Sequence, residues 1–298
     1  MKKLIFTFCL IAISISCNQQ KTPNKNIVND LDQKGITNQT PAIKKDYNLK
    51  ADGSVYTDQE LEAMSHDELI AVFREPPKDT VQTIGILLYD GYFMLDAMGP
   101  LSVLNHIPAK KILIGRNKGI VTSSDKVKIE VDHSIEEIDQ LDILLVPGGV
   151  IETYNATKDQ ILLDWIKKID QKSKYTLSVC TGAWILGAAG LLEGKEATTN
   201  WYRAKEKLNQ FGATFVQKRY TNDGKYWTSA GVSAGIDMSL ALIDHILGRN
   251  YAAFTALNLE YDPQPPFEGG HPDKTDRVVN FMTKKMYDHM LEPLITKD

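Results

Sequence analysis

The chain has 298 residues, of which 43% are hydrophobic and 24% are charged, and its formal net charge is −4. This composition excludes a disordered chain and a collagen-like repeat, and three cysteines are too few for a disulfide scaffold. The mild excess of acidic residues argues against nucleic acid as a partner.

The first sixteen residues have the pattern of an export signal. Two lysines are followed by an apolar run over residues 4–15, which is too short to span a bilayer as a helix. Residues 14–17, Ser-Ile-Ser-Cys, resemble the lipobox of bacterial lipoproteins, with serine at a position where leucine is more usual. We therefore expect a signal peptide over residues 1–16 and a lipid on Cys17, which would anchor the protein to a membrane of the bacterial cell envelope. The alternative is an ordinary secretory signal.

A polar tether and a small helical extension are predicted next. Residues 17–50 are rich in Asn, Gln, Lys and Thr and have little apolar content, which is typical of a flexible linker. Within residues 51–79, the sequences TDQE (57–60) and SHDE (65–68) both match the capping box, in which a Ser or Thr is followed three residues later by Glu. Two short helices are therefore expected there.

From residue 80 onward, buried-type strands alternate with helical patterns. The run over 81–89 is almost continuously apolar, as in a parallel strand that is covered on both faces. Further strands are predicted at 111–115, 141–146, 175–179 and 214–217, hairpins at 120–131 and 220–228, and helices at 94–105, 158–169, 183–192, 201–211 and 232–247. This alternation predicts an α/β domain over 80–262, doubly wound, with a mostly parallel sheet and helices on both faces.

The remaining residues, 263–298, are predicted to form an extension that ends in a helix over 273–293. Its apolar positions suggest one packing stripe against the body or a partner copy, made of Val278, Val279, Phe281, Met282, Met286 and Met290.

Candidate catalytic residues gather at predicted strand ends, where doubly wound sheets bind their ligands. One strand runs directly into Cys180 and a helix follows at once, which is a strand–nucleophile–helix arrangement. A helix N-terminus favours a thiolate, and the thiolate is the form that attacks carbon. Cys180 is therefore a candidate nucleophile, with a buried structural cysteine as the alternative.

Two other strand ends supply possible partners for this thiol. Gly148 and Gly149 allow close approach of the backbone, and their N–H groups are candidates for an oxyanion hole, with an ordinary turn as the alternative. Asp96 lies in an otherwise apolar stretch, where it would either cap a helix or exchange a proton with Cys180. A neighbouring thiolate would raise its pKa.

Together these stretches resemble the ThiJ/PfpI family, within the class I glutamine amidotransferase-like superfamily. The resemblance is greatest to the isonitrile hydratase branch and to the amidotransferase-like effector domains of some transcription regulators. It covers roughly residues 81–270 and implies a flavodoxin-like fold that is usually dimeric, with Cys180 at the elbow. The segments that carry it are FMLDAMGPLSVL (93–104), LLVPGG (144–149), SVCTGAWILGAAGLLEGKEATTNW (178–201), TSAGVSAGIDMSLALI (228–243) and EYDPQPPF (260–267).

The resemblance also implies roles for single residues. Asp96 corresponds to the acid paired with the thiol, Thr181 supplies a backbone N–H or a hydroxyl beside it, and Gly148 and Gly149 line the oxyanion side. Family proteases have histidine where this chain has Thr181, so we do not expect protease activity. Many regulator-type members have histidine where this chain has Asn200, which can hydrogen-bond a substrate but cannot act as a base.

The expected activity is that of a cysteine-dependent lyase. We expect a cofactor-free hydratase acting on a small electrophilic substrate such as an isonitrile, with Asp96 donating and accepting the proton; glyoxalase-like activity is a neighbouring possibility. Trp184, one helical turn after the thiol, is a candidate for lining the substrate pocket, with plain core packing as the alternative. No metal-ligand spacing is present in the sequence.

Non-enzymatic functions remain open at this point. The same cysteine would serve an envelope protein that binds a metabolite or senses oxidants. A DNA-binding regulator is less expected because residues 263–298 are too short for a paired helix-turn-helix module, and the sequence neither supports nor excludes a chaperone. The expected partners are a small-molecule substrate, a membrane through the lipid, and a second copy of the chain, with no nucleic acid.

Overall fold

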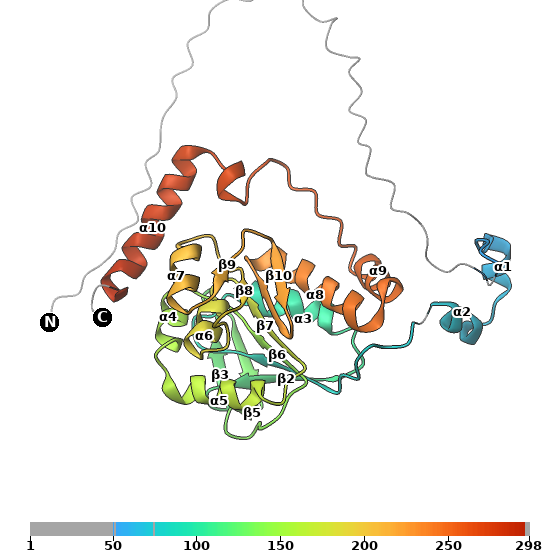
Figure 1. The fold of residues 1–298 in the computed structure, drawn as a ribbon, viewed down its shortest axis with the longest axis horizontal. Coiled ribbons are helices and arrows are strands. Elements are labelled where there is room, and N and C mark those ends of the chain that lie inside the picture. Colours follow the sequence, from blue (N-terminus) through green and yellow to red (C-terminus); the bar gives the residue numbers. More distant parts are fainter. Residues whose placement is uncertain (1–49, 51, 74, 296–298) are drawn as a thin grey trace, which may run out of the picture. The chain divides into compact units, whose positions relative to one another are not determined.

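A mostly parallel sheet lies at the centre of the computed structural model, which describes residue 50 and residues 52–73 and 75–295 (Figure 1). The predicted signal peptide, Cys17 and almost all of the tether lie outside the described residues. Neighbouring strands run parallel except in the β10–β11 hairpin, which confirms the predicted α/β fold. The strands of this central sheet are, in sheet order, β10 (Tyr220–Asp223), β11 (Tyr226–Ser229), β7 (Tyr175–Val179), β6 (Ile143–Val146), β1 (Thr83–Leu87), β2 (Lys110–Gly115) and β5 (His133–Ser134).

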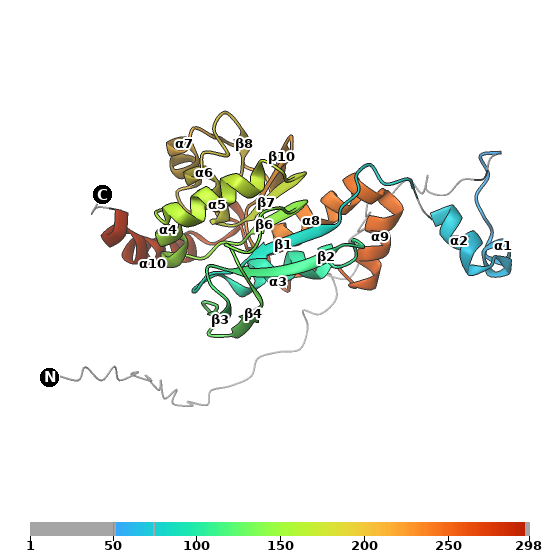
Figure 2. The ribbon, with the colours of Figure 1, turned by 90° about the horizontal axis from the view of Figure 1, so that it is seen from below.

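Helices cover both faces of this sheet. Figure 2 shows α3 (Met94–Leu104) and α5 (Gln160–Asp170) on opposite sides. α8 (Val232–Leu247) and α9 (Arg249–Asn258) pack on the α3 side, whereas α6 (Gly182–Ala188) and α7 (Ala204–Gln210) contribute to the core on the α5 side. Successive side chains of β6 enter different cores, because a strand alternates its side chains between the two faces. Double coverage explains why the central strands are apolar throughout.

Smaller elements surround the sheet. β3 (Gly119–Thr122) and β4 (Lys128–Val131) form the predicted antiparallel hairpin. The predicted strand over 214–217 is shorter, as β9 (Thr214–Phe215), and pairs with β8 (Glu196–Ala197), which the sequence pattern did not indicate. The patterns also did not indicate α4 (Ile151–Ala156), α9 or β5. The helix predicted from residue 201 begins at Ala204 because Arg203, just before it, has a left-handed backbone with φ of 49°.

The two helices of the N-terminal extension form where the capping boxes predict them. α1 (Asp58–Ala63) has Thr57 as its N-cap, with reciprocal hydrogen bonds between Thr57 and Glu60. Ser65 and Glu68 make the same pair of contacts at the start of α2 (His66–Phe73). Neither helix contains a buried residue. Among the described residues, no helix combines the length and the apolar character that crossing a bilayer requires.

The last helix, α10 (Arg277–Ile295), confirms the predicted C-terminal helix but not its packing stripe. A single 3₁₀ turn (Pro272–Lys274) precedes it. The buried residues of α10 are Asp288 and Leu291. Most of the stripe therefore does not pack on the body of the same chain, and packing against a partner copy stays a prediction; the exposed members are Val278, Val279, Phe281, Met282 and Met286.

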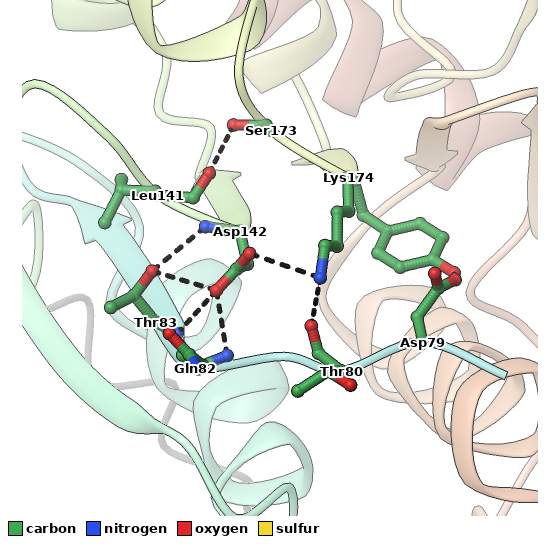
Figure 3. Close-up of polar contacts among 9 residues, drawn as sticks. Asp79, Thr80, Gln82, Thr83, Leu141, Asp142, Ser173 and Lys174 are labelled. Atoms are coloured by element: carbon green, nitrogen blue, oxygen red, sulfur yellow. Dashed lines mark hydrogen bonds and ion pairs between the residues drawn. The ribbon is translucent and has the colours of Figure 1, made fainter. Parts of the chain in front are cut away.

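The amino ends of the central strands are tied together by one carboxylate (Figure 3). Asp142 Oδ2 accepts the N–H groups of Gln82 (2.8 Å) and Thr83 (3.0 Å), and Asp142 Oδ1 lies 3.6 Å from Lys174 Nζ. Burial acts to raise the pKa of Asp142, but these donors together lower it below its usual value. This network holds β1, β6 and β7 in register at the edge opposite the candidate site.

Candidate active site

Cys180 occupies a sharp turn between β7 and α6. Its φ is +57°, a left-handed conformation that is uncommon for a residue with a side chain and stores strain. The turn is fixed from both sides, because the Cys180 N–H donates to the Ser229 carbonyl (3.0 Å) and the Thr199 hydroxyl donates to the Cys180 carbonyl (2.7 Å). Gly182 allows α6 to start this close to β6, since a Cβ there would lie 2.2 Å from the Val146 carbonyl oxygen. The predicted strand–nucleophile–helix arrangement is thus present.

Asp96 lies in the first turn of α3 and does not cap it. The N-cap is Phe93, and the carboxyl instead accepts the N–H of Gly148, with 3.2 Å from Oδ2 to the nitrogen. The side chain is fully buried, and Oδ1 makes no conventional hydrogen bond within the described residues. Burial raises the pKa of Asp96 to about 7, while the Cys180 thiol and the Gly148 N–H act to lower it. The sequence argument predicted the direction of this shift but not its cause, because burial raises the pKa of Asp96 and the Cys180 side chain acts to lower it.

The thiol itself is less acidic than the sequence suggested. Cys180 is only 3% exposed, and burial together with the Asp96 charge raises its pKa well above the usual value. The Thr181 N–H and the Asn200 side chain act in the opposite direction. The removal of water therefore raises the pKa of the Cys180 thiol by more than the helix N-terminus lowers it. At neutral pH Cys180 therefore keeps its proton, and the neighbouring Asp96 carboxyl is close to its own pKa of about 7.

The two glycines after β6 act through close packing. Their N–H groups are already used, because Gly148 donates to Asp96 and Gly149 donates to the Thr181 hydroxyl (3.0 Å). A Cβ on Gly148 would lie 2.7 Å from the Thr181 nitrogen and 2.9 Å from Asp96 Oδ2. Both N–H groups are thus engaged within the protein, and the oxyanion role of Gly148 and Gly149 stays a prediction. Because neither glycine has a side chain, the loops after β1, β6 and β7 can pack closely against one another.

Thr181 contributes its backbone to the thiol and its side chain to the scaffold. The hydroxyl donates to the Gly149 carbonyl (2.7 Å) and lies 3.2 Å from the Thr153 hydroxyl. Tyr89, at the end of β1, in turn donates to the Pro147 carbonyl (2.9 Å) and contacts Thr153. These contacts lock the loops after β1, β6 and β7 together. Thr153 lies in α4, which explains why the sequence patterns missed it.

Asn200 is oriented toward the thiol. Its Oδ1 accepts the N–H of Tyr202 (3.0 Å), so its NH₂ group is the part left to interact with Cys180, and it acts to lower the pKa of that thiol. An amide N–H is a donor only, and it stabilises sulfur when the sulfur carries negative charge. Asn200 thus lies close enough to Cys180 to affect the pKa of its thiol.

An aromatic cluster borders the thiol on the side of α10. Trp184 is 1% exposed and packs in this cluster with Tyr154, Tyr202 and Leu291, and its indole N–H has no hydrogen-bond partner among the described residues. Burial raises the pKa of Tyr287 in α10 to about 12, and the nearby Cys180 and Asp96 charges act in the same direction. The sequence patterns did not single out Tyr287, because nothing local to α10 indicates what the helix contacts.

No cluster of His, Cys, Asp and Glu suited to a metal ion occurs in the part of the chain that the structure describes. Four groups lie at the site: the Cys180 thiol, the Asp96 carboxyl with a pKa of about 7, the Asn200 amide and nearby aromatic side chains. This set suits the addition of sulfur to an electrophilic carbon, followed by proton transfer to the adduct.

Sequence comparison places this chain among known proteins. The model of the DJ-1/PfpI family matches residues 82–245. The isonitrile hydratase of Pseudomonas putida is 38% identical over 197 residues, which span 66% of this chain and 86% of that enzyme. The transcriptional regulators GbdR and CdhR of Pseudomonas aeruginosa are 28% and 30% identical, and the match spans about half of their length.

Solved structures support the same relationship. A ThiJ/PfpI family protein from Pseudomonas syringae superposes with a TM-score of 0.68 at 31% identity, covering 71% of this chain and 88% of that one. Drosophila melanogaster DJ-1beta has a TM-score of 0.56 at 20% identity, covering 61% of this chain and 98% of its own, which supports the fold alone.

Proposed function

Because this chain belongs to the DJ-1/PfpI family, we propose that it is a cysteine-dependent hydratase of a small electrophilic carbon, with isonitriles as the leading substrate class. The observation that carries the proposal is the pairing of Cys180 with a buried carboxyl, Asp96, whose pKa of about 7 suits both proton donation and proton acceptance. The similarity to a named isonitrile hydratase directs this chemistry toward the isonitrile carbon.

The first half-reaction joins the substrate to the protein. Asp96 takes the thiol proton, and the Cys180 sulfur forms a bond to the terminal carbon of the isonitrile, R–N≡C. Asp96 then returns the proton to that carbon, which gives a thioimidate, R–N=CH–S–Cys. The Asn200 amide and the Thr181 N–H stabilise the sulfur while it carries negative charge.

The second half-reaction releases the product. The Asp96 carboxylate takes a proton from water, the water oxygen adds to the thioimidate carbon, and the nitrogen is protonated. The carbon–sulfur bond then breaks, the hydroxyl proton passes to sulfur, and R–NH–CHO leaves. The sum is R–N≡C plus water giving an N-substituted formamide, with the thiol regenerated and no cofactor consumed.

The test is a substrate panel with the purified protein. Several alkyl and aryl isocyanides and several dicarbonyls are incubated with the reduced protein, and products are identified by mass spectrometry. We expect formamides from isocyanides. Lactate-type products from dicarbonyls alone would move the assignment to the glyoxalase-like neighbour, and no product from either class would refute the proposed activity.

The alternative function, oxidant sensing by the same cysteine, has less support from the site. Sensor cysteines react as exposed thiolates, whereas Cys180 is buried and its pKa is raised. The relatives that are transcriptional regulators keep a binding role open for the family. Mild peroxide discriminates: a sensor would convert Cys180 to sulfenic acid at low dose, and an enzyme would require a much higher dose to lose activity.

A further inference from the structure

Thr153 lies where the loops of the candidate active site meet. It belongs to α4, which begins just after the loop that follows β6, and its side chain is fully buried. Thr153 Oγ1 lies 2.9 Å from the Tyr89 hydroxyl oxygen and 3.2 Å from the Thr181 hydroxyl oxygen. Tyr89 follows β1, and Thr181 comes directly after Cys180. One hydroxyl group therefore joins the loop after β1 to the turn that carries the thiol.

Both partners of Thr153 are also bound to the loop after β6. The Tyr89 hydroxyl donates to the Pro147 carbonyl (2.9 Å), and the Thr181 hydroxyl donates to the Gly149 carbonyl (2.7 Å). The Gly149 N–H in turn donates to the Thr181 hydroxyl (3.0 Å). A Cβ on Gly149 would lie 2.9 Å from Thr153 Oγ1, so the backbone packs directly against this hydroxyl. The Thr153 hydroxyl is thus at the centre of a buried and closely packed network.

The Cys180 turn depends on contacts of this kind because its backbone is strained. Its φ of +57° is a left-handed conformation, which persists only where the surrounding structure holds it. The Cys180 N–H donates to the Ser229 carbonyl (3.0 Å), and the Thr199 hydroxyl donates to the Cys180 carbonyl (2.7 Å). The next side chain along the chain, Thr181, is held by the network around Thr153.

Loss of one contact in this network should make the turn easier to open. The Cys180 side chain is only 3% exposed, so a reagent reaches the sulfur mainly when the turn opens. The population of a local opening rises as the contacts that hold the closed form are removed. The reactivity of the thiol toward a small reagent therefore reports how firmly the turn is held.

We propose that Thr153 is a positioning residue of the Cys180 site, which holds the thiol in its buried and strained turn through the Thr181 side chain. Thr153 does not contact the substrate, and it acts only through Thr181. The hydroxyl rather than the bulk of the side chain is responsible, since valine has nearly the same shape as threonine. The inference rests on the proposed function in taking Cys180 as the reacting group.

Thiol alkylation tests this role without any substrate. The full chain is treated with iodoacetamide at pH 8 under native conditions, and modification of the Cys180 peptide is followed by mass spectrometry, which separates it from Cys9 and Cys17. Thr153→Val keeps the shape of the side chain and removes the hydroxyl. Because a hydrogen bond that holds the turn is lost, we expect Cys180 to react about 3–10-fold faster in this variant.

Two further variants separate the hydroxyl from the general stability of the fold. Thr153→Ser restores the hydroxyl and should return the alkylation rate close to that of the wild type. Thr255→Val is the matched control, because Thr255 is also helical and fully buried, and its hydroxyl donates to the Tyr251 carbonyl of its own helix (2.9 Å). It should leave the alkylation rate unchanged. In a Thr181→Val background, adding Thr153→Val should produce no further change.

Turnover of an isocyanide provides a second readout. Thr153→Val should lower kcat by roughly 10-fold and leave KM unchanged, because the thiol is held less firmly in its reacting direction while the substrate contacts are kept. Thr153→Ser should keep kcat close to the wild-type value. If the wild type converts no isocyanide, the proposed activity fails, and the alkylation rates alone decide the role of Thr153.

Three results would overturn the inference. The first is an unchanged alkylation rate in Thr153→Val. The second is an equal acceleration in Thr153→Ser or in Thr255→Val, which would mean that the Thr153 hydroxyl is not the cause. The third is an equal effect of Thr153→Val with and without the Thr181 hydroxyl, which would mean that Thr153 does not act through Thr181.

Discussion

At the scale of single residues, the site consists of a buried thiol and a buried carboxyl whose pKa values are both raised by burial. The sequence predicts that Asp96 and Cys180 are partners, because each stands out in its own apolar or strand-end context. It does not predict how little water reaches them, which depends on packing from α10 and from the loops after β1 and β6. The pKa of Asp96, raised to about 7 by burial, is a property of that packing.

Asp96→Asn should lower the turnover rate and raise the stability of the protein at pH 8. A carboxyl whose folded pKa is raised binds its proton more tightly in the folded state, so its contribution to stability is lost as pH rises from about 4 to about 7. Asparagine cannot ionise and can still accept the Gly148 N–H. We expect turnover to fall at least ~100-fold and the melting temperature at pH 8 to rise by about 2–8 °C.

The pH dependence of this rise in melting temperature tests whether burial of the Asp96 carboxyl is its cause. Thermal unfolding of Asp96→Asn and of the wild type should converge near pH 4, where the wild-type carboxyl is protonated in both states. A constant difference between pH 4 and pH 8, or a destabilised variant at pH 8, would contradict the burial account.

At the scale of elements, the site depends on three loops that meet after β1, β6 and β7. Regular alternation of buried strands with helices made these elements predictable, and α8 begins and ends at the predicted residues. Most of the elements that were missed are short, since α4 has six residues and β5 and β8 have two each, whereas α9 has ten. The role of α10 could not be predicted because its contacts are made with Tyr154 and Tyr202, far away in sequence.

Gly148→Ala tests whether close packing of these loops matters. The new methyl group would lie under 3 Å from Thr181 and Asp96, so the loop must shift and the Asp96–Gly148 hydrogen bond must lengthen. We expect a loss of about 1–3 kcal/mol in stability and a drop in turnover. Gly231→Ala is the matched control, since a Cβ there meets nothing within 4 Å. Equal effects in chemical denaturation would contradict the packing argument.

At the scale of the whole molecule, the sheet is secured at the edge opposite the site. Asp142 collects N–H groups from the start of β1 and lies near Lys174 (Figure 3). Asp142→Ala should cost about 1–3 kcal/mol at pH 7, because it leaves these donors unpaired. Since the pKa of Asp142 is lowered on folding, this stabilisation is present above about pH 4 and is lost as pH falls further. Urea unfolding of the wild type and of Asp142→Ala at pH 7 and pH 3 measures the loss of stability and its pH dependence. An equal loss of stability at pH 7 and pH 3 would contradict this role of the Asp142 carboxylate.

Anchoring is a separate prediction for the whole chain. We propose that Cys17 carries a lipid in the bacterial envelope, and that the protein is a homodimer there. Cys17→Ser, expressed in a bacterium, should then move the protein from the membrane fraction to the aqueous phase of a detergent partition, whereas Cys9→Ser should not. An unchanged distribution of Cys17→Ser would contradict lipidation, and a monomer mass by light scattering would contradict the dimer.

We propose that the Cys180 sulfur and the Asp96 carboxyl together add water to an electrophilic carbon. This is tested by ¹³C NMR of an isocyanide labelled at its terminal carbon, incubated with the wild type and with Cys180→Ala at equal concentration. We expect a growing formamide carbon signal with the wild type and none above the buffer rate with Cys180→Ala. Formamide formation at the wild-type rate by Cys180→Ala, or none by the fully reduced wild type, would contradict it.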